Sequence, residues 1–426
     1  MGLTEEETLA YLRSPAAIRE RCGQLFTLAC EDQLRYFVCD LTRLGRVADY
    51  VIQVIRDQYP DLQIPFHSRW RHFEAGGVPR LTQLDGLLAG LTPVERAAAK
   101  FDLVIISVLL DAGAGERWQY YEQETGLVFR RSEGLAVASF QMFYQGTFSS
   151  NDGLWADAQG LQGLTEEVLA AGFQVNPENP LVGVVGRLEL LQRLGRSLLS
   201  SPQMFGHENP RPGQMVNYLL ERSSNGRLAA ETVLSAVLEG LGDIWPGRLE
   251  IAGVNLGDVW PISIPNRDKD TAPAFVHQFT DRSSGGLGAG LVPFHKLSQW
   301  LTYSLLEPLQ ELGLEITGLD ALTGLPEYRN GGLCLDLGLL QVKHPSVLQQ
   351  RHSVGSDVIV EWRALTVILL DYIAAAVREA LGMSAEELPL VKVLQGGTWS
   401  AGRRIAAEHR ANGAPPIQIE SDGTVF

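Results

Sequence analysis

A row of polar side chains recurs every four residues between positions 293 and 308, at Gln299, Tyr303 and Glu307. In a helix this spacing places the three groups on one face, one above the other. Amide, phenol and carboxyl groups are typical of a half-buried, hydrogen-bonding face rather than of a solvated one. We therefore expect the segment Pro293–Gly332 to form one wall of a buried polar site for a small molecule. A hydrogen-bonded network between packed helices is the alternative.

Cationic side chains are concentrated shortly after the predicted N-terminal helix, which ends at residue 58. The segment 67–80 contains two histidines, three arginines and a tryptophan: His67, Arg69, Trp70, Arg71, His72 and Arg80. Arginine grips a phosphate or carboxylate through paired hydrogen bonds, and a neighbouring histidine can hold or transfer a proton. The segment therefore predicts a site for an anionic group. A basic surface turn paired with acidic neighbours is the alternative.

A second cationic position is Lys296, which follows a glycine-rich stretch at residues 283–290. Backbone N–H groups at a helix N-terminus attract anions, and a lysine in the first turn adds a point charge. A phosphate could bind there. The stretch matches neither a P-loop nor a dinucleotide-binding glycine motif, so a flexible surface loop is an equally good reading of it.

Carboxyl groups at unfavourable positions are candidates for proton transfer. Asp111 ends the apolar run 103–110, in a helical turn where the helix dipole disfavours a carboxylate. Burial would raise its pKa towards the range of a general acid or base, whereas an ion pair with an arginine is the alternative. Glu361 and Arg363 interrupt an apolar helical pattern, so they must be paired or must face a ligand.

The turn at residues 322–332 offers polar side chains from irregular backbone, where ligand-binding groups are often presented. These side chains are Glu327, Arg329 and Asn330. Glu133 and Arg403 lie in similar polar stretches and are further candidates for ligand binding. Motifs typical of serine hydrolases, zinc sites, redox thiols and nucleoside triphosphatases are missing from the sequence, so we expect neither a metal nor a cofactor.

The elements that must position these residues are predicted to be mostly α-helices with a few short strands. Predicted helices cover residues 4–58, 93–110, 165–172, 184–199, 214–241, 293–312 and 357–381. Predicted strands cover residues 259–264, 333–342 and 416–419. Thr4 and Glu7 are spaced as a capping box, and Thr165 has the type and position of an N-cap. Long loops at 173–180, 202–212, 262–290 and 396–426 are expected to line a site.

Composition and charge limit the expected size of the fold, the cellular compartment and the binding partners. With 426 residues, 45% of them hydrophobic, the chain can bury a large core, and we expect two lobes of one interlocked unit with soft boundaries near 150–180 and 265–290. The net charge of -15 repels phosphate backbones and anionic lipids, so nucleic-acid and membrane partners are not expected. Four cysteines without CxxC spacing and an acidic N-terminus without an apolar segment predict a cytoplasmic protein. The sequence leaves the oligomeric state open.

Several long blocks of the sequence resemble one known family. They are PFHSRWRHFEAGG (65–77), SVLLDAGAG (107–115), RSEGLAVASF (131–140), PFHKLSQWLTYSLLEPL (293–309), LTGLPEYRNGG (322–332), GGTWSAGR (396–403) and the terminal DGTVF. Together they resemble the uracil catabolism protein 4 family of fungi and bacteria. The resemblance implies a place in a route in which uracil becomes its ribonucleotide, a relative of GTP cyclohydrolase II opens the ring, and urea is released.

A more distant resemblance links the chain to the queuosine-nucleotide N-glycosidases, helical proteins similar in architecture to DNA glycosylases. Glu361–Ala364 is similar to their Glu-Ile-Arg-Ala, and Leu297–Leu305 is similar to a segment there that carries Asp-Tyr-Arg. Thr302 stands where their Asp would be, and Ser304 where their Arg would be. The resemblance therefore implies the fold and the bond type, but it does not carry over the catalytic carboxylate.

Together the resemblances imply a two-lobed helical N-glycosidase that hydrolyses ribosylurea 5-phosphate to urea and ribose 5-phosphate. Such a reaction needs a carboxylate near the anomeric carbon, a cationic grip on the phosphate and a wall for the sugar. The candidate carboxylates are Asp111, Glu307, Glu327 and Glu361. Phosphate candidates are His67, Arg69, Arg71, His72 and Lys296, and sugar-wall candidates are Trp70, Trp300 and Tyr303. An amide or ureide hydrolase acting on the same fragment, and a non-catalytic carrier for the ring-opening enzyme, are the alternatives.

Overall fold

A computed structural model describes residues 3–151, 153–245, 249–264 and 287–420. The chain divides into two compact units, each built from separate stretches of sequence. Unit 1 comprises Met1–His67, Arg248–Gln299 and Leu319–Ser421, and unit 2 comprises Ser68–Gly247, Trp300–Gly318 and Asp422–Phe426. The predicted boundary at 150–180 falls inside unit 2, whereas most of the predicted boundary at 265–290 lies outside the described residues.

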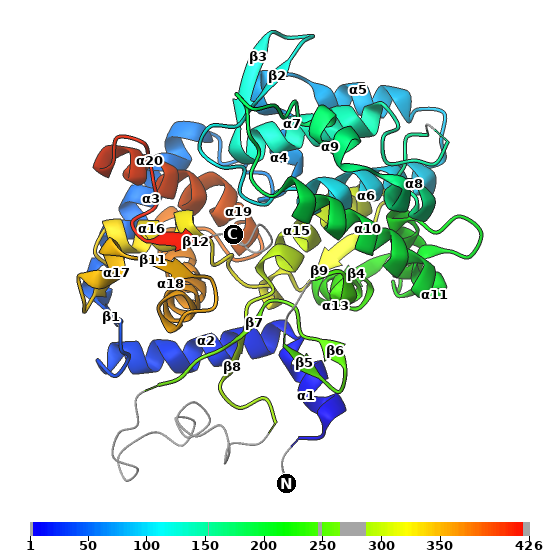
Figure 1. The fold of residues 1–426 in the computed structure, drawn as a ribbon. Coiled ribbons are helices and arrows are strands. Elements are labelled where there is room, and N and C mark those ends of the chain that lie inside the picture. Colours follow the sequence, from blue (N-terminus) through cyan, green and yellow to red (C-terminus); the bar gives the residue numbers. More distant parts are fainter. Residues whose placement is uncertain (1–2, 152, 246–248, 265–286, 421–426) are drawn as a thin grey trace. The chain divides into compact units, whose positions relative to one another are not determined.

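Unit 1 is organised around one long apolar helix, α18 (Asp357–Leu381). Its remaining principal helices are α1 (Glu5–Leu12), α2 (Pro15–Cys30), α3 (Leu44–Gln58), α16 (Tyr328–Asp336), α17 (Ser346–Gln349), α19 (Leu390–Val393) and α20 (Trp399–His409). Helices α2 and α3 both pack against α18, and α16 packs against α18 and α20. Figure 1 shows α18 beside the long helix α2. Because apolar residues cover nearly the whole circumference of α18, it forms the centre of the unit 1 core.

Unit 2 is centred on α6 (Pro93–Leu109), another helix that is buried along most of its length. The other helices are α4 (Trp70–Phe73), α5 (Arg80–Leu87), α7 (Arg131–Tyr144), α8 (Ala158–Gly163), α9 (Glu166–Gly172), α10 (Val184–Ser200), α11 (Pro202–Phe205), α12 (Met215–Glu221) and α13 (Ala230–Gly240). Helices α7, α10 and α12 each pack against α6. Helix α15 (Lys296–Glu311) starts in unit 1 and continues in unit 2 from Trp300 onward.

Strands in the described residues are short and pair two by two. The antiparallel pairs are β1 (Phe37–Cys39) with β10 (Leu340–Val342), β2 (Gln119–Glu122) with β3 (Leu127–Arg130), β5 (Glu250–Ile251) with β6 (Val254–Asn255), and β7 (Val259–Pro261) with β8 (Leu291–Pro293). The parallel pairs are β4 (Arg227–Ala229) with β9 (Glu315–Thr317) and β11 (Arg351–Ser353) with β12 (Gln418–Glu420). A mostly helical fold with several short strands is therefore confirmed.

Helix-start signals in the sequence proved accurate. The Thr4 hydroxyl accepts the Glu7 N–H at 3.2 Å, and the Glu7 carboxylate accepts the Thr4 N–H at 2.8 Å, which is the predicted capping box. The Thr165 side chain caps α9 as expected. Helix α18 also begins and ends where its apolar pattern predicts.

Some predicted elements were wrong because chain pairing overrode the helical pattern. The helix predicted over 4–58 is interrupted after Cys30, where Asp32 adopts a φ of 56° and β1 pairs with β10 instead. The helix predicted over 214–241 breaks at Asn225, with a φ of 52°, before β4 pairs with β9. At both interruptions the backbone N–H and C=O groups find hydrogen-bond partners on another strand rather than within their own helix.

Three helices arose where a strand or a loop was expected, among them the short helix α11, which lies in the predicted loop 202–212. The predicted strand 333–342 is helical as far as Asp336, and only Leu340–Val342 is a strand. The predicted loop 396–426 contains α20. In α16 and α20 the glycines that suggested irregular backbone instead allow close helix packing.

Helices α16 and α20 are in close contact at Gly402. A Cβ atom there would overlap the carbonyl oxygen of Arg329, which cannot move without displacing α16. We predict that Gly402→Ala lowers the free energy of unfolding by about 1–3 kcal/mol. Gly45 in α3 is the matched control, since nothing lies within 4 Å of a Cβ placed there. Gly45→Ala should be neutral or stabilise by up to about 1 kcal/mol, and equal urea midpoints for the two variants would contradict the close packing.

Among the helices of the described residues, none has the length and apolar character needed to cross a lipid bilayer.

Candidate functional site

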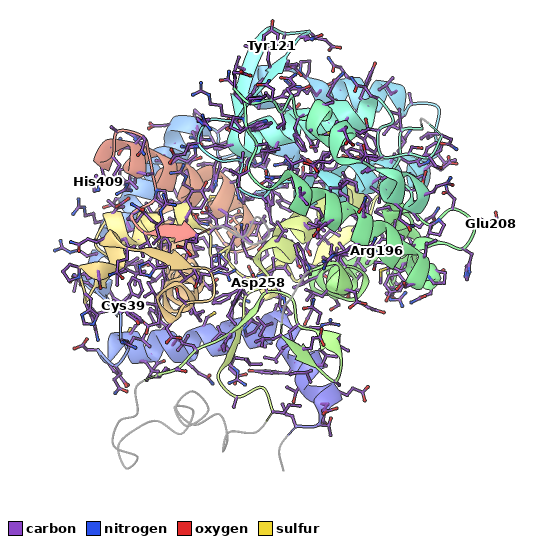
Figure 2. The ribbon with its side chains drawn as sticks, in the orientation of Figure 1. Cys39, Tyr121, Arg196, Glu208, Asp258 and His409 are labelled. Atoms are coloured by element: carbon purple, nitrogen blue, oxygen red, sulfur yellow. The ribbon has the colours of Figure 1, made fainter. Side chains whose placement is uncertain are left out.

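The N-terminus of helix α15 is capped by a side chain from another segment of unit 1. The carboxylate of Asp258, labelled in Figure 2, accepts the N–H of Lys296 at 3.0 Å. Both terminal nitrogens of Arg363 donate to the same carboxylate, at 2.8 and 2.7 Å. Burial alone would raise the pKa of Asp258, but Arg363 and the N–H donors outweigh it and hold that pKa well below its usual range.

The first turn of α15 is fixed on two further sides. The side chain of Gln299 accepts the Thr323 N–H at 2.8 Å and donates to the carbonyl of Phe294 at 3.1 Å. The imidazole Nε2 of His295 lies 2.8 Å from the carbonyl of Leu12. In unit 1 the start of α15 is therefore held rigidly. At Gln299, therefore, the alternative interpretation of the predicted polar row applies: its side chain belongs to a hydrogen-bonded network between packed elements.

In unit 2 the continuation of α15 carries Glu307, which lies among side chains of the basic segment. The Ser68 hydroxyl donates to Glu307 Oε1, and Arg71 Nη2 donates to Glu307 Oε2 at 2.9 Å. Burial raises the pKa of Glu307, and this exceeds the lowering effects of Arg71 and Ser68. The Glu307 side chain is 22% exposed, so it can be reached from solvent. We call Ser68, Arg69, Arg71, Asp111 and Glu307 the Glu307 cluster.

Arg69 anchors this cluster and is itself completely buried. Its Nε donates to the Ser107 hydroxyl at 2.8 Å, and its Nη1 donates to Asp111 at 2.7 Å. Asp111 also accepts a hydrogen bond from the Ser132 hydroxyl at 2.8 Å. The pairing of Asp111 with an arginine, which was the alternative for this residue, is the arrangement found.

The short helix α4 is tied directly to α15. The hydroxyl of Ser304 accepts the Arg69 N–H at 2.9 Å, and the carbonyl of Ser304 accepts the Trp70 indole N–H at 2.7 Å. Ser304 was not expected to bind anything; its signal was its place on the same helix as Tyr303 and Glu307. Arg69, Trp70 and Ser304 are all buried. These two hydrogen bonds therefore hold the segment that carries Arg71 against the part of α15 that carries Glu307.

Two buried N–H donors of the Glu307 cluster have no hydrogen-bond partner among the described residues. They are Nη2 of Arg69 and Nε of Arg71. Buried donors in folded proteins are nearly always paired, with protein, water or ligand. These two guanidinium edges are therefore suited to an oxygen-rich ligand such as a phosphate or a sugar hydroxyl.

Glu327 and Glu361 lie in unit 1 and are occupied by backbone groups. Glu327 caps α16, accepting the Arg329 N–H at 2.8 Å and the Asn330 N–H at 2.6 Å. Glu361 accepts the backbone N–H groups of residues 35 and 36 at 3.1 and 3.0 Å. Burial raises the pKa of both carboxyls, that of Glu361 to about 7. These contacts give each carboxylate a structural role, and a catalytic role for either stays a prediction.

A second group of polar residues lies within unit 1 around His67. The His67 Nδ1 atom is 2.9 Å from the amide oxygen of Gln395, and its ring centre is 5.7 Å from that of Trp399. Lys296 interacts electrostatically with His67 and with Glu327. Gln395 and Trp399 were not predicted as site residues, although Trp399 belongs to the block GGTWSAGR.

The remaining candidates are distributed over both units. In unit 2, the rings of His72 and Trp300 meet edge to face at 5.7 Å, Tyr303 is buried, and Glu133 lies in the first turn of α7. In unit 1, Arg329 donates to the carbonyl of Gly413 and Asn330 donates to that of Leu325. Arg403 lies over the Trp399 ring at 4.9 Å. Of the predicted glycine-rich stretch, residues 283–286 lie outside the described part of the chain.

Comparison with known proteins gives consistent matches over the whole chain. A family model described as "Protein of unknown function (DUF1688)" matches residues 11–426. "Uracil catabolism protein 4" of Lachancea kluyveri is 39% identical over 456 residues, covering 100% of both chains. "Protein urg3" of Schizosaccharomyces pombe is 40% identical over 430 residues, covering 99% of both chains.

Proposed function

Because the chain belongs to the DUF1688 family and a full-length relative is named for uracil catabolism, we propose that it acts in uracil catabolism as a hydrolase of an N-ribosidic bond. The proposed substrate is a ring-opened uridine monophosphate fragment, ribosylurea 5-phosphate. In the reaction the C1′–N bond breaks, the oxygen of water bonds to C1′, and a proton passes from water to the ureido nitrogen. The products are urea and ribose 5-phosphate.

The observation that carries this proposal is the environment of the Glu307 carboxyl group, namely its exposure, the direction of its pKa shift and its hydrogen bonds. Of the four candidate carboxylates, it combines partial exposure with a pKa that burial raises. It accepts hydrogen bonds from the side chains of Ser68 and Arg71, whereas Glu327 and Glu361 accept from backbone N–H groups. A carboxylate of this kind can take a proton from water and can stabilise positive charge at an anomeric carbon. Glu307 therefore fits a general base in a hydrolysis at C1′.

The unpaired edges of Arg69 and Arg71 support a phosphorylated sugar as the ligand. Both belong to the same short segment as Ser68, so they are close in sequence to the group that holds Glu307. Charge-assisted hydrogen bonds from guanidinium to phosphate are roughly twice as strong as neutral ones. An acidic protein with a net charge of -15 needs such a local cationic site to hold an anionic substrate. A fold like that of DNA glycosylases, with two lobes, is part of the same proposal.

Incubation of the purified protein with ribosylurea 5-phosphate tests the proposal. Reducing sugar and urea should appear in equal amounts. Release of ammonia with the ribosyl bond intact would instead indicate the ureide hydrolase, and tight binding without any product would indicate the carrier. Either outcome would overturn the glycosidase.

The pH dependence of kcat/KM gives a prediction that follows from the pKa of Glu307. Burial raises that pKa above the ordinary 4.5, so the base form is gained only at higher pH, and the acid limb should lie above pH 4.5. Arg71 lowers the pKa of Glu307, so Arg71→Gln should move the limb to still higher pH. Arg196→Gln is the control, since Arg196, labelled in Figure 2, is exposed in unit 2. If the acid limb of Arg71→Gln stayed at the pH of the wild type, Arg71 would not set the pKa of the catalytic base.

A further inference from the structure

Arg187 is a buried cation of unit 2 that lies outside the Glu307 cluster. It ends the first turn of α10, where the dipole of that helix disfavours a positive charge, and it is 1% exposed. Burial lowers the pKa of Arg187 to about 10, and the charge of Asp111 offsets this effect only in part. Burying a charge is costly unless hydrogen bonds compensate for it, so the partners of Arg187 are informative.

In the described part of the chain, Arg187 donates to backbone carbonyl oxygens and pairs with no carboxylate. Its Nε donates to the carbonyl of Leu110 at 2.9 Å, and its Nη2 donates to that of Gly113 at 3.3 Å. Its terminal nitrogens also donate to the carbonyls of Ala112 and Val182. Three of these four carbonyls belong to the turn at the end of α6, the helix against which α10 packs (Figure 1). A cation there satisfies carbonyls that the helix leaves unbonded, and the α6 dipole favours it.

The same turn carries Asp111, a carboxylate at the end of α6, where the helix dipole disfavours a negative charge. The charge of Arg187 attracts it and so compensates for that position. Asp111 in turn accepts hydrogen bonds from Arg69 Nη1 at 2.7 Å and from the Ser132 hydroxyl at 2.8 Å. By holding the turn, Arg187 therefore fixes the place from which Asp111 binds Arg69.

The guanidinium of Arg69 is fixed on another side by two serines. Its Nε donates to the Ser107 hydroxyl at 2.8 Å, which lies 2.7 Å from the Ser139 hydroxyl. Ser139 donates its own proton to the carbonyl of Ala136 at 2.9 Å, so the proton between the two serines belongs to Ser107. These hydrogen bonds all run in one direction. Together with the carboxylate on Nη1, they determine the plane of the guanidinium.

We propose that Arg187 is a positioning residue for Glu307, acting through Asp111 and Arg69. The segment that Arg69 anchors also supplies the two side chains that donate to Glu307, at positions 68 and 71. The place of Arg69 therefore determines how closely those donors approach the carboxylate. The part that this arrangement plays in catalysis rests on the proposed function.

The pKa of Glu307 reports the position of its partners without any substrate. Carbon-13 spectra of the glutamate-labelled protein measure it, and the signal is identified by its absence in Glu307→Gln. Arg187→Met should raise the pKa of Glu307 by about 1 unit, because Arg71 lowers that pKa less once the two side chains separate. Arg196→Met is the matched control, since Arg196 is exposed on the same helix, and it should leave the pKa unchanged.

Arg187→Lys separates the effect of position from that of charge. Lysine keeps the positive charge near Asp111, but it lacks the planar fork that reaches four carbonyls. It should therefore raise the pKa of Glu307 nearly as much as Arg187→Met does. A wild-type pKa in Arg187→Lys would overturn the proposal, because charge alone would then account for the methionine variant. If Arg187→Met does not fold, the lysine variant decides the matter by itself.

A double variant distinguishes positioning from a merely structural role. If Arg187 acts on Glu307 by way of Arg71, Arg187→Lys should have no further effect on the pKa of Glu307 in the Arg71→Gln background. A general loosening of unit 2 would instead shift the pKa equally in both backgrounds. That result would contradict the proposal.

Failures of the two proposals can be told apart. If Arg187→Lys raises the pKa of Glu307 but the wild type releases no sugar from ribosylurea 5-phosphate, the positioning role stands and the glycosidase does not. If sugar is released while Arg187→Lys leaves the pKa unchanged, the glycosidase stands and the positioning role does not. If both proposals hold, the acid limb of kcat/KM in Arg187→Lys should move to higher pH together with the pKa, with little change in KM.

Discussion

Replacing Glu307 by glutamine is expected to lower kcat on ribosylurea 5-phosphate by about 10³-fold, with a much smaller change in KM. Glutamine keeps the shape of the side chain and can still accept from Ser68, so the cluster should remain assembled. It cannot accept a proton from water or carry the negative charge that stabilises an oxocarbenium-like state. The loss should therefore fall on the chemical step. Steady-state release of urea and reducing sugar measures it.

Glu311→Gln is the matched control, because Glu311 lies one turn further along α15 and is 57% exposed. This variant should keep nearly full activity. Ser68→Ala should have an intermediate effect, since it removes one hydrogen bond to Glu307 and leaves the carboxylate itself in place. If Glu307→Gln retained wild-type activity, Glu307 would not be the base, and Asp111 would be the remaining carboxylate of the Glu307 cluster.

Arg363→Met is expected to have the largest effect on stability, lowering the free energy of unfolding by about 3–5 kcal/mol. The Arg363 side chain is 1% exposed and that of Asp258 is 14% exposed, so the substitution leaves a largely buried carboxylate without its cation. The remaining donors to Asp258, from Lys296 and Trp260, are too few to replace a bidentate pair. Urea unfolding at pH 7 measures the change.

The pH dependence of this loss has a definite sign. The folded-state pKa of Asp258 lies below its ordinary value of 3.8, so the pair stabilises the protein above that pH and its contribution is lost as pH falls further. In Arg363→Met the carboxylate can protonate at low pH, and the difference from wild type should narrow there. Asp258→Leu combined with Arg363→Met should recover part of the stability at pH 7, since neither charge is left buried.

An exposed pair provides the comparison for Arg363. The side chains of Arg227 and Glu315 are 60% and 64% exposed, so Arg227→Met should cost no more than about 1 kcal/mol. If Arg227→Met and Arg363→Met lowered the free energy of unfolding equally, burial would not determine how much the Asp258–Arg363 pair stabilises the protein.

Local sequence signals predicted several helix starts and the whole of α18, because such signals act within one turn. The capping box of Thr4 and Glu7, the N-cap Thr165 and the apolar pattern of α18 each repeat or act over three or four residues. Part of the Glu307 cluster could also be predicted from the sequence. Residues 69 and 71 identified a basic segment, and the spacing of Gln299, Tyr303 and Glu307 identified a polar helix face.

Long-range partners were beyond the reach of the sequence. Glu307 is bound by Ser68 and Arg71, which lie 239 and 236 residues away. The cap of α15 comes from Asp258, 38 residues before Lys296, in a stretch that shows no helical signal. Glu361 is conspicuous in the sequence, yet the N–H groups of residues 35 and 36, which it accepts, are 326 and 325 residues away and reach it only through the fold. The polarity of a residue is local, whereas its partner is decided by tertiary packing.

The interleaving of the two units affects how the protein is made on the ribosome. Unit 1 needs Leu319–Ser421, so helices α2 and α3 are translated long before α18, the helix against which both pack. Of the described part of unit 2, Trp300–Gly318 alone is still to be made once residue 247 has emerged, and α6, α7 and α10 can associate earlier. The apolar faces of α2 and α3 are therefore exposed during most of translation, when a chaperone can bind them. Protease digestion of chains stalled near residue 250 should cut within α2 and α3 and spare α6.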